Sequence, residues 1–276
     1  MYNKVSLFHV ALSFMLTTFG SMEGMAQGAA VSPSRIFFSG NPGQTLHQLV
    51  EVSNTSTKPL LFNISIKDWE RDSVGNKVYH EPGTLSASNA NWLEVNSQTI
   101  EIPPGATKSV DIMMHVPSGE NTKPQVTNSM VFFTQVVEQR PVTEVTQGSG
   151  VGINIQLEFG VHVYHTPTGF SRKELDFVEF NELTVNGDEN KRAVAVKIKN
   201  TGEVVTDAYL RFEMTNKATG EELKIDPLSI SMMPFDEQLV QLSLPADIKG
   251  KFLIVAILDY GAGTNLKIAE KEVVYE

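Results

Sequence analysis

The side chains that could carry out chemistry are histidines and carboxylates, because the chain has six histidines, 32 acidic residues and no cysteine. No two histidines have the spacing of a metal motif on a helix, and His162 and His165 fall on opposite faces if they share a strand. No Gly-rich phosphate loop or G-x-S-x-G nucleophile elbow occurs. Carboxylates are numerous enough for a paired-carboxylate hydrolase, but they alternate along strands as solvated faces do. We therefore expect no enzyme, no metal and no other cofactor.

Composition narrows the class of partner. The length of 276 residues suits two domains, and 41% of the residues are hydrophobic, enough for a core in each. The net charge of −10 and the absence of a basic run argue against nucleic acid and against an anionic membrane surface. The lack of cysteine excludes a disulfide framework, thiolate metal sites and a cysteine nucleophile.

The N-terminus predicts export. Lys4 precedes a mostly apolar stretch, Val5 to Phe19, and Gly24-Met25-Ala26 reads as a cleavage site. A membrane anchor is the alternative, but about 15 residues are few for a span of roughly 20. We expect a signal peptide at 1–26, cleavage near Ala26, no later membrane span, and a periplasmic mature protein.

The rest of the chain reads as strands, with no convincing long helix. Period-2 alternation and turn residues predict strands in the first half at Arg35–Ser39, Leu46–Ser53, Leu60–Lys67, Thr99–Ile102, Ser109–Val116, Met130–Glu138 and Gly150–Tyr164. The second half predicts Leu175–Val185, Ala193–Lys199, Asp207–Asn216, Glu222–Ile225, Ser229–Met232, Leu239–Leu244, Lys251–Asp259 and Ile268–Tyr275. This pattern is typical of an all-β protein with two tandem immunoglobulin-like β-sandwiches, at 27–166 and 167–276.

A short internal similarity supports two related domains. Val52-Ser53-Asn54-Thr55 resembles Ile198-Lys199-Asn200-Thr201, and each follows an alternating strand. Four residues are weak evidence on their own.

The segment from Gly150 to Tyr164 is the one that suggests a function. Every odd position from Val151 to Val163 is apolar, so one whole face is hydrophobic. A central strand packing on its own core is the alternative. As a strand, however, the thirteen residues from Val151 to Val163 would span about 44 Å, which is more than one small sandwich covers. We expect part of this face to lie on an exposed edge and to add as a strand to a partner.

Several motifs resemble the periplasmic pilus-assembly chaperones, the PapD-like family. Ser34-Arg35-Ile36-Phe37-Phe38 resembles the opening strand of that family, and Val50–Asn54 its next strand. Ser129–Phe133 through Arg140-Pro141 resembles the strand before the long donor strand, Val151–Pro167 the donor strand itself, and Asp259-Tyr260-Gly261 a turn near the C-terminus. The sequence is thus similar to a divergent member of this family.

The resemblance implies donor-strand complementation, in which the chaperone lends a strand to an incomplete immunoglobulin-like pilin. Ile153, Ile155 and Leu157 would insert into the client, with Val151 and Phe159 flanking them.

The resemblance also implies an anchor for the client's C-terminal carboxylate. Arg35 falls on the family's arginine position, although a surface salt bridge is an alternative for it. The family's lysine position holds His162, whose partial charge a nearby arginine would lower further. Of the family's charged interdomain contact, Asp259 is kept, whereas Asn128 and Thr166 replace its glutamate and arginine.

Two functions from different classes follow. We expect a periplasmic chaperone that stabilises exported fimbrial or surface-fibre subunits by β-strand donation, with an outer-membrane usher as a further partner. Self-association through the donor strand is an alternative when no client is present. The alternative function is a structural or adhesive cell-surface protein, such as a scaffold of cell-wall complexes.

Overall fold

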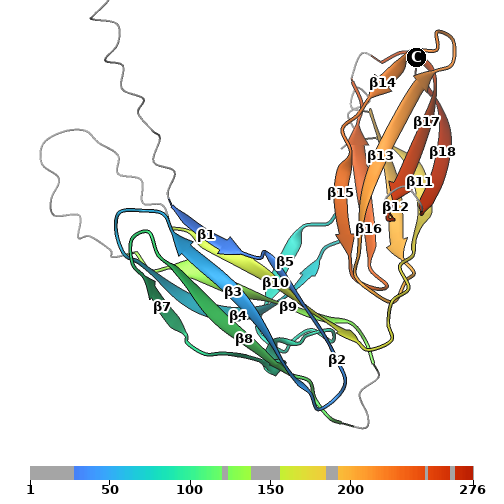
Figure 1. Cartoon of the computed structure of the whole chain (residues 1–276). Helices are drawn as coiled ribbons and strands as arrows, with labels where there is room; N and C mark the ends of the chain where they lie inside the picture. Colours follow the sequence, from blue (N-terminus) through green and yellow to red (C-terminus); the bar gives the residue numbers. More distant parts are fainter. Residues whose placement is uncertain are drawn as a thin grey trace, which may run out of the picture.

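The computed structural model describes residues 28–119, 124–137, 156–184, 192–245, 248–261 and 265–275. These residues form two β-sandwiches in tandem, joined at an angle, with strands β1 to β10 in the first and β11 to β18 in the second (Figure 1). The predicted fold class, all-β with two immunoglobulin-like sandwiches, is confirmed. The predicted signal peptide lies outside the described residues, and none of the described helices is long and apolar enough to cross a membrane.

The first domain packs a four-stranded sheet on a six-stranded sheet. The smaller sheet has the order β1 (Ala29–Ser32), β3 (Thr45–Asn54), β8 (Thr107–His115) and β6 (Leu93–Val95). The larger has the order β2 (Arg35–Gly40), β10 (Glu158–Pro167), β9 (Thr127–Gln135), β4 (Leu60–Arg71) and β5 (Lys77–His80), and β7 (Thr99–Ile102) also pairs with β4. A single 3-10 turn among the described residues, η1 (Ala90–Trp92), precedes β6.

Alternating residues of both sheets meet in one core. Val50, Phe62, Ile112, Phe133 and Val163 are fully buried there. The other face of the larger sheet carries a smaller cluster, described below, because its strands are apolar on both sides. Burial on both faces explains why all seven residues from Thr127 to Phe133 are buried.

The N-terminal strand changes sheets at Pro33. β1 pairs with β3 in the smaller sheet, and β2 then runs parallel to β10 in the larger one. Proline has no backbone N–H and cannot continue a ladder, so the crossing falls where the sequence has Pro33. As a result β2 accompanies β10 only from His162 onward, where His162 lies opposite Arg35.

The second domain packs a three-stranded sheet on a five-stranded one. The first has the order β11 (Leu175–Thr184), β12 (Arg192–Asn200) and β16 (Glu237–Ser243). The second has the order β14 (Glu222–Lys224), β13 (Thr206–Asn216), β17 (Gly250–Asp259) and β18 (Leu266–Tyr275), and β15 (Leu228–Met232) also pairs with β13. Val196, Leu210, Ile254, Ala256 and Leu258 lie in its core.

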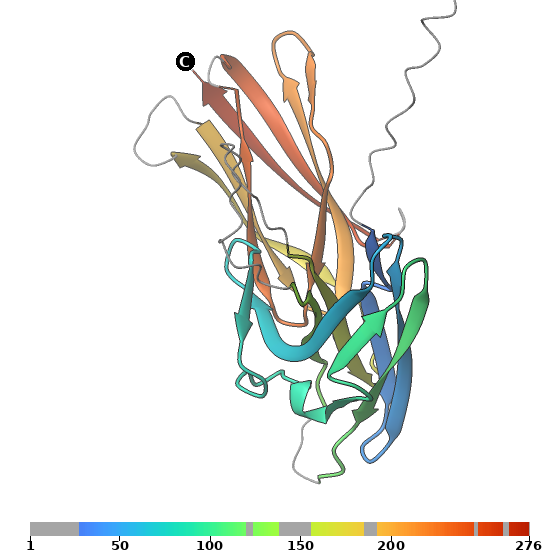
Figure 2. The same ribbon diagram turned by 90° about the vertical axis from the view of Figure 1, so that its left-hand side faces the viewer.

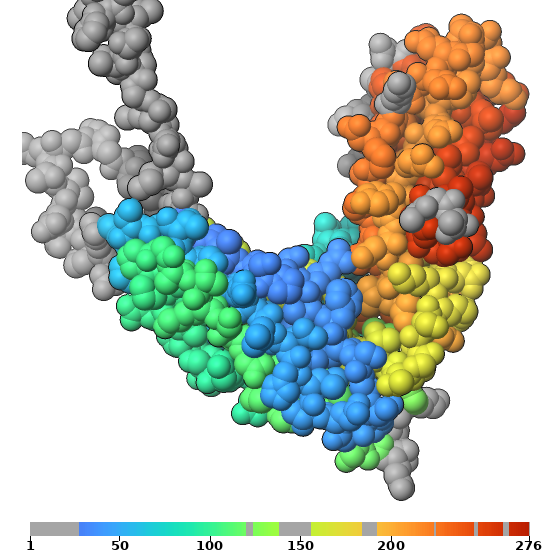
Figure 3. All heavy atoms as spheres, in the orientation of Figure 1, coloured from blue at the N-terminus to red at the C-terminus, as the bar shows by residue number. Residues whose placement is uncertain are grey.

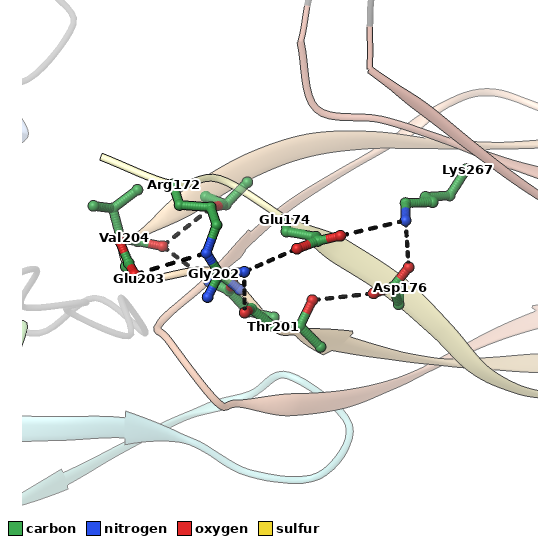
Figure 4. A network of polar contacts seen from close by, with 10 residues as sticks. Arg172, Glu174, Asp176, Thr201, Gly202, Glu203, Val204 and Lys267 are labelled. Carbon is green, nitrogen blue, oxygen red and sulfur yellow. Dashed lines mark hydrogen bonds and ion pairs between the residues drawn. The ribbon is translucent and has the colours of Figure 1, made fainter. Parts of the chain in front are cut away.

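A polar clamp attaches the interdomain linker to the second domain (Figure 4). The Arg172 Nη1 donates to Glu174 Oε2 and to the carbonyl of Thr201, both at 2.8 Å. The backbone N–H groups of Thr201 and Gly202 donate to the carbonyl of Glu174. Lys267 of β18 extends the network through Asp176 at 2.6 Å. The chain therefore belongs to the second domain from Arg172 onward, which leaves Thr168 to Ser171 as the connection.

Most predicted strands are present, and three short ones were missed. β1, β5 and β6 have three or four residues each, a length at which alternation is a weak signal. The long predicted strand Gly150–Tyr164 is described from Gln156 onward, and β10 begins at Glu158 and continues to Pro167.

Candidate functional site in the interdomain cleft

The cleft between the domains has an apolar floor on the outer face of the larger sheet. Trp69, Met130, Phe132 and Tyr164 form a buried cluster there, against which Val205 and Met233 of the second domain pack. The indole Nε1 of Trp69 donates to the carbonyl of Ser129 at 3.0 Å, so the ring has one fixed orientation. The cluster holds the domains together and gives the groups around it a shared low-dielectric surface.

The hairpin of β4 and β5 reaches from the first domain toward the second. Figure 2 shows the curved ribbon of β4, and Figure 3 shows an open angle between the domains with the cyan atoms of this hairpin beside the second domain. The Arg71 Nε donates to the carbonyl of Ser231 at 3.1 Å, and the Leu239 N–H donates to the carbonyl of Ser73 at 2.8 Å. These two hydrogen bonds fix the hairpin on the second domain.

An ion pair between Arg35 of β2 and Asp207 of β13 crosses the cleft. The Arg35 Nη1 lies 2.8 Å from each carboxylate oxygen of Asp207. Both side chains are accessible, at 39% and 60% exposure. They line a cavity of about 490 Å³ whose walls also carry Arg71, Tyr209 and Asp259. The salt bridge that was the alternative interpretation of Arg35 is therefore present, and it lies in the cleft.

His162 lies beside Arg35 but carries no charge at neutral pH. Its ring meets Trp69 edge to face at 4.5 Å, and burial lowers its pKa to about 4, with further lowering by the charges of Lys77, Arg35 and Arg71. His165 lies on the opposite face, as predicted: it is buried and contacts the carbonyl of Gly40. His162 therefore adds no positive charge beside Arg35 at neutral pH.

Lys77 and Arg71 provide the positive charges that the sequence analysis missed. They are opposite one another in the β4–β5 pair, and the charge of Lys77 lowers the pKa of His162 more than either arginine does. Burial lowers the pKa of Lys77, followed by repulsion from Arg71 and Arg35. The turn-forming run Asp72 to Asn76 was the available signal for this hairpin, since it separates two segments that pair. The cleft thus gathers three cations, of which Arg35 faces Asp207.

The predicted donor strand is described in part. Val151, Ile153 and Ile155 lie outside the described residues. Leu157 is half-buried, and its carbonyl accepts a hydrogen bond from the Gln135 N–H at 2.8 Å. Phe159, predicted as a flanking donor residue, instead packs on the domain's own core, with its ring 6.2 Å from that of Phe62. From Phe159 onward, the apolar face of β10 therefore packs on the domain's own core. The alternative interpretation of this strand expected this.

The edge of β10 is open at its beginning. Among the described residues, Glu158 to Val161 pair with β9 on one side, and β2 joins on the other side only at His162. This follows from the sheet change at Pro33, which directs Ala29–Ser32 to β3. A bare edge of this kind accepts an added strand.

Asp259, predicted as an interdomain residue, lies at the end of β17 opposite Tyr209 and lines the same cavity as Arg35. A second cavity of about 570 Å³ lies between the domains, lined in part by Trp69, Arg71 and Phe235. Phe235 is 74% exposed and has a φ of 69°. In the part of the chain with described coordinates, no group of three or more histidine and carboxylate side chains could hold a metal ion.

Comparison with known proteins shows similarity to solved structures alone. No protein-family model matches the chain, and no curated protein matches it. The chain is similar to the YadV chaperone, at 12% identity and a TM-score of 0.47, with 89% of this chain and 100% of that chain covered.

Two complexes are also similar. One is the CsuC–CsuE chaperone–tip subunit pre-assembly complex of Acinetobacter baumannii, at 10% identity and a TM-score of 0.47, covering 88% of this chain and 97% of the other. The other is the SafA pilin with the SafB chaperone of Salmonella enterica, at 14% identity and a TM-score of 0.42, covering 91% and 97%. Fimbrial chaperones, the class that the sequence motifs resemble, are therefore among the structures similar to this chain.

Proposed function

We propose that this chain is a divergent PapD-like periplasmic chaperone that holds exported fibre subunits by strand addition at the open edge of β10. The observation that carries the proposal is the one-sided pairing of Glu158 to Val161. Unpaired N–H and C=O groups on an edge give an incoming strand both affinity and register. The client class follows from this chemistry: a β-rich protein that lacks a strand.

The apolar residues before β10 supply the side chains for this addition. Val151, Ile153, Ile155 and Leu157 alternate in phase with Phe159, which already faces the chain's own core. The alternation would therefore continue one apolar face from this core into the groove of the client. Each fully buried aliphatic side chain contributes roughly 1.5–3 kcal/mol.

The cleft supplies an anchor for the end of the client chain. Arg35 is the carboxylate ligand in this proposal, with Lys77 and Arg71 providing the second positive charge in place of His162. A guanidinium suits a terminal carboxylate because its N–H groups match the two oxygens. An anion also relieves the mutual repulsion of the three cations.

Affinity purification of the mature protein with a C-terminal tag, followed by mass spectrometry, tests the proposal. We expect a stoichiometric, β-rich exported subunit to co-elute, and Ile155→Asp to lose it while the variant stays folded. Gln156→Asp is the matched control, because it adds the same charge at the next position, where the side chain is exposed.

Two results would contradict the proposal. If Ile155→Asp fails to fold, Ile155 belongs to the chain's own core and the donor segment loses its basis. If the protein elutes alone, or with cell-wall material regardless of the substitution, the structural surface protein becomes the better function.

A further inference from the structure

The ion pair between Arg35 and Asp207 has a role beyond joining the domains. We infer that Asp207 is a built-in competitor: it occupies the carboxylate anchor in the empty chaperone and must be displaced by the C-terminal carboxylate of the client. This inference rests on the proposed function, and it adds a residue that sets how strongly a client must bind.

The chemistry of Asp207 matches that of the expected ligand. Its side chain ends in a carboxylate, as a peptide chain does, and both of its oxygens lie 2.8 Å from the Arg35 Nη1. With one guanidinium nitrogen held in this way, a second carboxylate cannot use the end-on pair of nitrogens on Arg35. Two carboxylates on one guanidinium would also repel each other at short range.

Asp207 shares its cavity with two of the three cations, Arg35 and Arg71. It lies on β13 directly opposite Ser231 of β15, whose carbonyl accepts the hydrogen bond from Arg71. Arg35 and Arg71 therefore reach neighbouring positions of the second domain. An anion that enters this cavity would therefore meet Asp207 already paired with Arg35.

The pair is accessible enough to be exchanged. Asp207 is 60% exposed and Arg35 39%, so water and a client can reach both. Exposed ion pairs contribute little to stability. The domains keep other contacts without it: the packing of Val205 and Met233 on the Trp69 cluster, and the hydrogen bonds to Ser231 and Ser73. Loss of the pair would therefore free Arg35 without separating the domains.

A client can use the anchor only while Arg35 is not paired with Asp207. The association constant of every such client is therefore multiplied by the fraction of time in which Arg35 is unpaired. Because this factor is the same for every client that uses the anchor, it raises the threshold for capture without changing the order of affinities. Asp207 can also return to Arg35 when a client leaves, so the same residue favours release.

The test compares two fluorescent heptapeptides of alternating threonine and valine, identical except that one ends in a free carboxylate and the other in an amide. Fluorescence anisotropy gives their affinities for the mature wild type, Asp207→Asn, Asp207→Ala and Arg35→Ala. We expect both Asp207 variants to bind the acid peptide about two- to fivefold more tightly and the amide unchanged. Arg35→Ala should lose the preference for the acid.

Unchanged or weaker binding of the acid peptide by both folded Asp207 variants would overturn the inference, since Asp207 would then be neutral or would hold Arg35 in place for the ligand. Failure of the inference alone is recognisable, because the wild type would still prefer the acid over the amide. If neither the wild type nor the two Asp207 variants prefer the acid, the carboxylate anchor fails together with its competitor, while client co-purification still reports on strand addition.

Discussion

Asn54 and Asn200 make the same set of hydrogen bonds in the two domains. Each is fully buried, and each Nδ2 donates to the carbonyl four residues later, of Lys58 or Val204, and to the carbonyl of a neighbouring strand. Each Oδ1 accepts the N–H two residues later, of Ser56 or Gly202. The same side chain therefore closes the same turn twice.

Replacing either asparagine by alanine should destabilise its own domain. Each substitution removes three hydrogen bonds that close the turn, which costs about 2–4 kcal/mol. Urea unfolding of Asn54→Ala and Asn200→Ala measures this, with the exposed Asn96→Ala as control. Equal stability of all three variants would mean that water replaces the asparagine at no cost.

The neutral state of His162 predicts a loss of stability in acid. The folded protein lowers the pKa of this group from 6.5 to about 4, so the unfolded chain binds the proton more readily. The stability that the neutral His162 ring contributes is complete above about pH 6.5 and is lost as the pH falls toward 4. We expect it to reach about 1–2 kcal/mol after solvent screening.

Thermal unfolding between pH 7.5 and 4 checks this. The difference in slope between wild type and His162→Gln isolates the histidine, and the exposed His47→Gln is the control. Parallel curves for wild type and His162→Gln would show that the ring charges freely in the folded state.

Phe235 should be replaceable by glycine with a gain in stability. Its φ of 69° is a left-handed conformation that costs a phenylalanine about 1–2 kcal/mol, and its ring is largely exposed. After the entropic cost of glycine, a net gain of about 0.5–1 kcal/mol remains. Phe235→Ala, which keeps the strain, is the control and should show no gain.

The amount of client captured by Phe235→Gly tests whether the exposed ring of Phe235 also binds the client. A variant that is more stable but captures less client would assign the exposed ring at the second cavity to the binding surface. A less stable variant would instead show that the ring stabilises its own domain.

Gly202→Ala should weaken the polar clamp that attaches the interdomain linker to the second domain. A Cβ at this position would lie 2.6 Å from the carbonyl oxygen of Arg172 and 2.7 Å from the backbone nitrogen of Glu174, and neither can move without the linker. We expect a loss of about 1–3 kcal/mol. No atom of the described residues lies within 4 Å of a Cβ built at Gly119, so Gly119→Ala should match the wild type in calorimetry.

Lys77 and Arg35 should both matter for carboxylate binding, and His162 should not. Arg35→Ala and Lys77→Ala are expected to weaken binding of the acid heptapeptide several-fold and to reduce its salt dependence. The exposed Lys58→Ala serves as control. A loss in His162→Gln equal to that in Arg35→Ala would return the second anchor role to the histidine.

The features that could be predicted from the sequence are those that show as a periodic pattern or as a position within a motif. Alternation located the long strands, and the Asn54 and Asn200 similarity, four residues long, reflects a shared set of hydrogen bonds. Arg35 was found by its position in a motif. Lys77 was not, because its charge reaches His162 through a hairpin with a four-residue strand, β5, a length at which alternation is a weak signal. Asp207 was not singled out either, since its partner lies 172 residues away on another domain.

The sheet change at Pro33 has a practical consequence for anyone handling the protein. Since β2 runs parallel to β10, the segment before it starts at the same end of the sandwich as the open edge. A tag or fusion placed ahead of Ala29 therefore joins the domain at this end, where we expect it to interfere with strand addition more than a C-terminal tag does. Fusions after β18 attach to the second domain, and lengthening β2 until it pairs with Glu158 to Val161 would close the edge that the proposed function uses.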